Sequence, residues 1–96
     1  MSPTNKKKLD LLRIKLDKLD TELLKLIKKR SNLVNNVLKV KIHKKEIIDQ
    51  KRINFILKKI NKKSIQLKID PKISNRIWKN MIWSFIDYER RNFKKK

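Results

Sequence analysis

Hydrophobic residues recur every three and four positions through the first forty residues of the chain. The spacing holds without a break from residue 9 to residue 40, and one position of the row, Arg30, is not aliphatic. Such a row predicts a long helix with a heptad seam, which no Gly or Pro interrupts. The row consists of Leu9, Leu12, Leu16, Leu19, Leu23, Leu26, Arg30, Leu33, Val37 and Val40.

The helix expected over residues 6–41 is too long for a compact single chain. It would measure about 54 Å at ~1.5 Å per residue. A globular chain of this length has a radius of gyration of only about 12 Å. The seam of a lone helix would therefore stay exposed, and the pattern predicts a dimer in which the long helices pack on each other.

Two shorter helices are expected after a break at residues 42–46. The second helix is predicted over residues 47–62, with its apolar side formed by Ile48, Phe55, Ile56 and Ile60. A loop of undefined form follows, up to Ile69.

The pair Asp70-Pro71 is a strong helix start, because Asp caps free N–H groups and Pro fits the first helical position. The third helix is predicted over residues 71–92, and residues 93–96 form a basic tail. The sequence therefore predicts a single all-α domain over residues 1–96, with long, short and medium helices in an intertwined homodimer.

Composition narrows the possible chemistry. The 96 residues include no Cys, no Gly and a single His, His43, which fits a solvated loop. Disulfides, thiolate zinc sites and glycine-rich phosphate loops are excluded, and a His-based metal site is not expected. We expect no cofactor and no metal.

The charge is strongly positive, with 29 Lys and Arg against 9 Asp and Glu and a formal net charge of +20. Because lysines are spread over the whole chain, no one-sided basic face is expected, and nucleic-acid binding should be weak, nonspecific and abolished by salt. No targeting segment and no membrane-spanning apolar run is visible, so we expect a cytoplasmic protein without membrane contact.

Four charged residues fall on faces that should be apolar: Arg30, Lys41, Arg52 and Glu89. Each has a simpler explanation alone, such as a snorkelling Arg30, a solvated Lys41, an Arg52 paired with Asp49, or a Glu89 paired with a lysine. Together they predict an anion pocket inside a helical bundle, suited to a small polycarboxylate.

These residues and their separations resemble the all-helical AroQ-type chorismate mutases. The resemblance covers about Leu9 to Phe93, nearly the whole chain. It is carried in the first helix by Leu12-Arg13, Leu16, Leu19-Asp20, Leu23-Leu24, Ile27, Arg30, Leu33-Val34, Val37 and Lys41. It continues through Asp49, Arg52, Ile56-Leu57 and Ile60, and then Asp70-Pro71, Ile77-Trp78, Met81-Ile82, Ile86 and Glu89.

The resemblance implies an intertwined homodimer with two equivalent sites. It implies an isomerase that converts chorismate to prephenate by a Claisen rearrangement, on the route to Phe and Tyr, without a bond between enzyme and substrate. Arg30 and an Arg13 from the partner chain would hold the two substrate carboxylates. Within one straight helix these two arginines are ~25 Å apart, which also favours a site shared across the dimer.

The resemblance also assigns the remaining substrate contacts. Arg52 would contact the enolpyruvyl side, Lys41 would donate to the ether oxygen, and Asp49 would lie at the ring hydroxyl. Glu89 falls beside the same ether oxygen, where it must be protonated to donate a hydrogen bond. Activity is therefore expected to fall as rising pH removes that proton.

Two positions depart from the commonest pattern of the family. Ile53 stands where Glu is frequent, and Phe85 where Ser is frequent. Both departures resemble isochorismate-pyruvate lyase, a relative on the same fold, which remains the first alternative function. A non-catalytic, basic helical dimer that binds nucleic acid is the second alternative.

Overall fold

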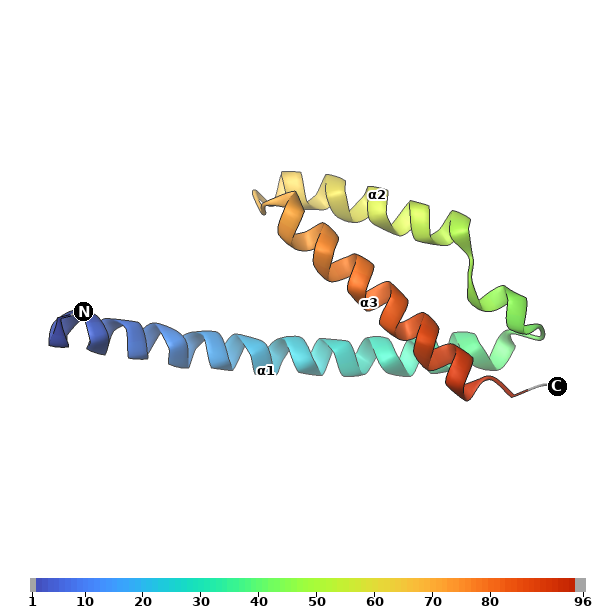
Figure 1. Cartoon of the computed structure of the whole chain (residues 1–96), viewed down its shortest axis with the longest axis horizontal. Helices are drawn as coiled ribbons and strands as arrows, with labels where there is room; N and C mark the ends of the chain where they lie inside the picture. The colour runs from blue at the N-terminus through green and yellow to red at the C-terminus, as the bar shows by residue number, and fades with distance from the viewer. Residues whose placement is uncertain (1, 95–96) are drawn as a thin grey trace. The chain divides into compact units, whose positions relative to one another are not determined.

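The computed structural model describes residues 2–94, and all regular structure in this range is helical. Three α-helices, long, short and medium, confirm the all-α, three-helix part of the predicted fold (Figure 1). A short 3₁₀ helix lies between the first and the second. In chain order the elements are α1 (Pro3–Val40), η1 (Lys44–Ile47), α2 (Gln50–Gln66) and α3 (Pro71–Asn92).

The chain forms two compact units that divide between Leu33 and Val34, inside α1. The first unit is helix, and no residue of α1 is buried. The seam side chains Leu16, Leu19 and Leu23 are each more than half exposed. The seam is therefore an exposed apolar stripe along α1, a feature typical of interaction surfaces.

Helix α1 begins three residues earlier than predicted. Ser2 precedes its first residue, and the Ser2 hydroxyl accepts the N–H of Asn5 at 3.1 Å. Pro3 then occupies the first helical position, where its missing N–H costs nothing. The helix ends at Val40, and the Lys41 N–H bonds to the Leu38 carbonyl at 3.2 Å.

The predicted bounds of the second helix, 47–62, were wrong at both ends. Helix α2 starts at Gln50 because Asp49 caps it: Asp49 Oδ1 accepts the N–H of Arg52 at 3.0 Å. Ile47 belongs to η1 and is buried in the core. The Glu46 carboxylate steadies η1 by accepting the N–H of the exposed His43 at 2.8 Å.

The carboxyl end of α2 runs on to Gln66, where the sequence predicted a loop. The N–H of Lys68 bonds to Ile65, and that of Ile69 bonds to Ser64, as in a Schellman turn. Lys68 adopts a left-handed φ of 57°. Glycine usually fills this position, and because the chain has none, no stop signal for the helix is visible there.

Helix α3 spans the predicted residues, and Asp70 Oδ1 caps it by accepting the N–H of Lys72 at 3.0 Å. The next residues are not all a solvated tail. Phe93 is half-buried and packs against the core, because it continues the apolar face of α3. Lys94 is exposed, and residues 95–96 of the predicted tail lie outside the described residues.

The core of the second unit lies between α2, α3 and η1. Its apolar members are Ile47, Ile53, Ile82 and Ile86, with Leu38, Ile56, Leu57 and Phe93 packed around them. The predicted apolar side of α2 is therefore rotated, since Ile53 is buried while Phe55 is 54% exposed and Ile48 precedes the helix.

We expect Lys68→Gly to stabilise the protein, because glycine removes the steric cost of a left-handed residue. That cost is roughly 1–2 kcal/mol, and glycine's extra chain entropy offsets part of it, so the net gain is about 1 kcal/mol. Thermal denaturation should show a Tm higher by about 4–8 °C. The matched control Lys62→Gly, inside α2, should lower the Tm, and a fall in the Lys68→Gly variant would contradict the assignment.

Candidate functional site

Lys41 and Glu89, both predicted as catalytic residues, are in direct contact. The Lys41 Nζ donates to Glu89 Oε1 at 3.0 Å across 48 residues of sequence. The Lys41 side chain is 17% exposed and the Glu89 side chain 8% exposed. The structure thus brings together a cation and a carboxylate at the edge of the core.

Local structure explains how the two side chains meet. Glu89 continues the row of Ile82 and Ile86 on α3, and spacings of four and three residues keep all three on one helix face. Lys41 follows the last residue of α1 directly. A second bond lies close by in sequence, since the Tyr88 hydroxyl donates to Asn35 Oδ1 at 2.7 Å. Two polar contacts therefore hold the end of α3 against the end of α1.

The burial of Glu89 makes its partner important. A carboxylate taken out of water loses several kcal/mol of hydration, which a close ammonium group offsets. An ammonium group carries three N–H donors, and the bond to Glu89 uses one of them. Lys41 therefore keeps donors for a second acceptor next to Glu89.

A shallow pocket of about 410 Å³ adjoins Lys41. Its volume is within the range of small-molecule sites. Lys41 and Asp49, two predicted site residues, both line it, so the structure places them in one concavity. The other lining residues are Glu46, Ile48, Gln50 and Lys51, none of which the sequence indicated as functional.

The sequence predicted that Arg52 lies on an inward face of its helix, and the structure contradicts this. Arg52 is exposed, and its guanidinium lies over the Phe55 ring, 5.3 Å from the centroid. The cause is the rotated helix face, which turns Ile53 inward and its neighbour Arg52 outward. Asp49 Oδ1 accepts the backbone N–H of Arg52, so this carboxylate oxygen caps the start of α2.

The two residues that depart from the family pattern have different surroundings. Ile53 is 7% exposed and belongs to the hydrophobic core. Phe85 is half-buried on α3, one turn before Glu89 and therefore on the same side of the helix. The structure gives Ile53 a packing role and puts Phe85 in the row that ends at Glu89.

Arg13 and Arg30 both lie in the first unit, on α1. Arg13 is exposed and Arg30 is half-buried. They are 17 residues apart on one continuous helix, which separates them by about 25 Å along its axis. Within a single chain they therefore cannot grip the same small ligand.

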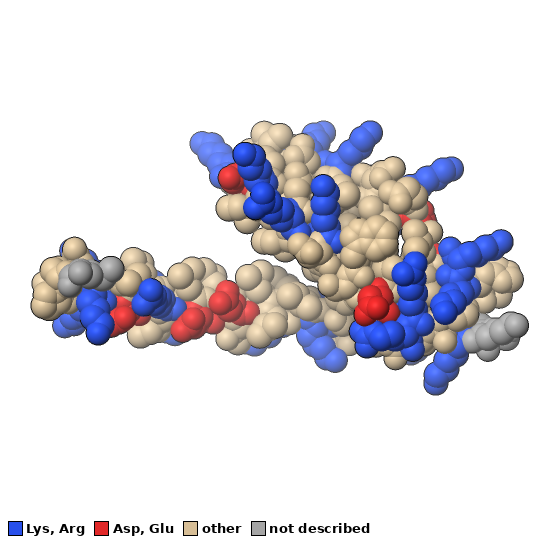
Figure 2. Space-filling model, in the orientation of Figure 1, with Lys and Arg blue, Asp and Glu red and all other residues tan. Residues whose placement is uncertain are grey.

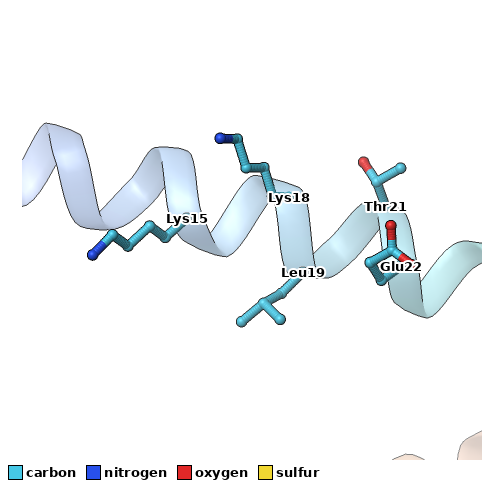
Figure 3. A pocket seen from close by; sticks show the side chains of 5 residues that line it. All are labelled: Lys15, Lys18, Leu19, Thr21 and Glu22. Atoms are coloured by element: carbon cyan, nitrogen blue, oxygen red, sulfur yellow. The ribbon is translucent and has the colours of Figure 1, made fainter.

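A further depression on α1 does not form a site. Lys15, Lys18, Leu19, Thr21 and Glu22 line it, and all five belong to the same helix. Figure 3 shows their side chains leaving the ribbon in different directions, without a point on which they converge. It lacks the convergent polar groups of a ligand site.

Comparison with known proteins assigns the chain to a family. The family model for chorismate mutase type II matches residues 12–90, and the chain belongs to that family. No curated protein and no solved structure matches the chain.

The described residues carry two further negative findings. Among residues 2–94, no three His, Cys, Asp or Glu side chains come together in a group that can hold a metal ion. In the same range no helix combines the length and the apolar character that crossing a membrane requires.

The sequence did not indicate the Asn35–Tyr88 hydrogen bond. Its partners lie 53 residues apart, and a single amide–hydroxyl contact leaves no periodic signal. The pocket residues Glu46 and Gln50 were missed because η1 was not predicted and the second helix was expected to start at residue 47. Asp49, a residue with strong capping preference before a polar turn, was the available signal for those bounds.

Proposed function

We propose that the protein is a chorismate mutase that rearranges chorismate to prephenate. The observation that carries the proposal is the Lys41–Glu89 contact at 3.0 Å, within a chain of the chorismate mutase type II family. Chorismate is a dianion with an ether oxygen between its two reacting halves. A basic site with a donor aimed at that oxygen suits this reaction, which needs no nucleophile and no cofactor.

Lys41 and Glu89 would stabilise the transition state in which the C–O bond breaks. Negative charge grows on the ether oxygen as that bond lengthens, and N–H or O–H donors fixed there stabilise the transition state more than the substrate. Lys41 has donors left beside the one that Glu89 accepts. Glu89 contributes a second donor only when its carboxyl carries a proton.

The arginines would bind the substrate, because a planar guanidinium group can form two parallel hydrogen bonds to one carboxylate. Arg30 and an Arg13 from a second copy of the chain would each hold one carboxylate. Arg52 would contact the enolpyruvyl side after leaving the Phe55 ring, and Asp49 would reach the ring hydroxyl from the pocket it shares with Lys41. Phe85 would supply apolar surface, and the buried Ile53 would act only by packing in the core behind the site.

The proposed homodimer follows from the seam on α1. Burying a Leu that is more than half exposed gains on the order of 1 kcal/mol, and the seam offers eight leucines and valines besides Leu9. A second copy brings an identical seam, and two copies related by a two-fold axis cover each other. The same arrangement supplies the Arg13 that one chain cannot bring to its own Arg30.

We expect the purified protein to convert chorismate to prephenate, and Arg30→Ala to lower kcat/KM by about 100-fold, or about 2.7 kcal/mol. The loss reflects an unpaired substrate carboxylate. Product identification by chromatography with absorbance decay measures both, and Arg76→Ala, an exposed arginine on α3, serves as the matched control that should leave turnover unchanged.

No turnover of chorismate at any pH between 5 and 8 would contradict the mutase proposal. Isochorismate is then the substrate to test, with salicylate and pyruvate as products, because Ile53 and Phe85 resemble that lyase. Failure with both substrates would favour a non-catalytic helical protein.

We expect Glu89→Gln to keep or raise kcat/KM with chorismate, because an amide N–H donates to the ether oxygen whereas a charged carboxylate repels its growing charge. Steady-state rates of the two proteins, measured side by side at one pH, test this. A large loss of activity in Glu89→Gln would contradict a donor role at this position.

A further inference from the structure

We propose that the outer face of α2 binds single-stranded nucleic acid without sequence preference. This binding would be a second activity. Its surface shares Lys51 and Arg52 with the proposed substrate site, and its other four cations lie farther along α2. It rests on a one-sided concentration of cations around an exposed aromatic ring, which the sequence, with lysines along its whole length, did not indicate.

The charge of α2 is entirely of one sign. The helix contains no Asp or Glu, and all six of its charged residues are exposed cations. At about 100° per residue, they all lie within ~80° of Phe55, on the side opposite the buried Ile53. These six residues, the α2 basic face, are Lys51, Arg52, Lys58, Lys59, Lys62 and Lys63.

The neighbouring part of α3 extends this positive surface. Lys72, Arg76 and Lys79 are exposed, and a hydrogen bond of 3.3 Å from Asn75 to Asn61 joins the two helices. Between residues 50 and 86 the one carboxylate is Asp70, which caps α3. Figure 2 shows few acidic side chains among the cations of this region, whereas they alternate with lysines along α1.

A single strand matches this face in chemistry. The row from Lys51 to Lys63 is about 18 Å long, which is enough to contact several consecutive phosphates of one strand. Phe55 is 54% exposed at the centre of the row. Arg52 and Lys59 lie over its ring, 5.3 and 5.9 Å from the centroid. A base that stacks on Phe55 would take the place of one of these cations, which would then be free to bind a phosphate.

An acidic protein is the weaker candidate for this face. Protein interfaces depend on a central, desolvated apolar cluster, whereas the α2 basic face has one exposed ring among six cations. A single-stranded nucleic acid can use both the cations and the exposed ring, because its phosphates bind the cations while its bases stack on the ring.

Fluorescence anisotropy with a labelled 15-nucleotide oligo-dT at 50 mM KCl tests the proposal. The wild-type chain should bind with a micromolar or lower Kd. The variant Lys58→Gln/Lys59→Gln/Lys62→Gln/Lys63→Gln should bind at least 20-fold more weakly, while its rate with chorismate should match that of the wild type.

The matched control is Lys7→Gln/Lys18→Gln/Lys25→Gln/Lys28→Gln, which removes the same four charges from α1, outside the seam. Its Kd should change less than threefold. Equal losses in the two quadruple variants would overturn the proposal, since net charge alone would then explain binding. Circular dichroism checks that both variants remain helical, and Lys58→Gln/Lys62→Gln replaces the quadruple change if it unfolds.

Phe55→Ala separates strand binding from simple charge attraction. It should weaken oligo-dT about tenfold and a duplex of the same length less than twofold, because paired bases cannot stack on the ring. Equal effects on both probes would contradict a single-strand site. Displacement of oligo-dT by polyglutamate of equal charge and at equal concentration would also overturn it, in favour of an acidic polypeptide.

Discussion

The contact between Lys41 and Glu89 is the interaction on which the arrangement of the second unit depends. Glu89 is buried at the end of the apolar row of α3, where an uncompensated carboxylate would be costly. The end of α1 supplies the compensating ammonium, and Tyr88 and Asn35 add a neutral bond next to it in sequence. In the proposed reaction the same pair faces the ether oxygen, so the contact that closes the core also forms the centre of the site.

The exposed seam of α1 places the second constraint on the protein. Its leucines have no buried position within the chain, and the two arginines proposed for the substrate carboxylates lie about 25 Å apart along the same helix. The proposed two-fold dimer would resolve both problems together, because an interface that covers the seams would also bring one chain's Arg13 to the other chain's Arg30. Assembly and substrate binding would then depend on the same surface.

Much of this could be predicted from the sequence where a repeated pattern or a strong cap was present. The 3–4 row predicted α1, Asp70-Pro71 predicted the start of α3, and the helix faces of Lys41 and Glu89 indicated that the two side chains lie close together. Single contacts were harder to predict. One capping bond from Asp49 set the start of α2, and a left-handed Lys68 ended it. The face of α2 that packs on the core contains Ile53, so its neighbour Arg52 is exposed.

Subunit mixing tests the shared site most directly. Arg13→Ala and Arg30→Ala, each inactive alone with chorismate, are mixed in equal amounts after reversible unfolding and refolded together. Random pairing makes half of the dimers mixed, and each mixed dimer has one intact site, so about a quarter of the wild-type activity should return. A mixture that stays inactive, with mixed dimers shown by mass spectrometry, would contradict a site that takes Arg13 from one chain and Arg30 from the other.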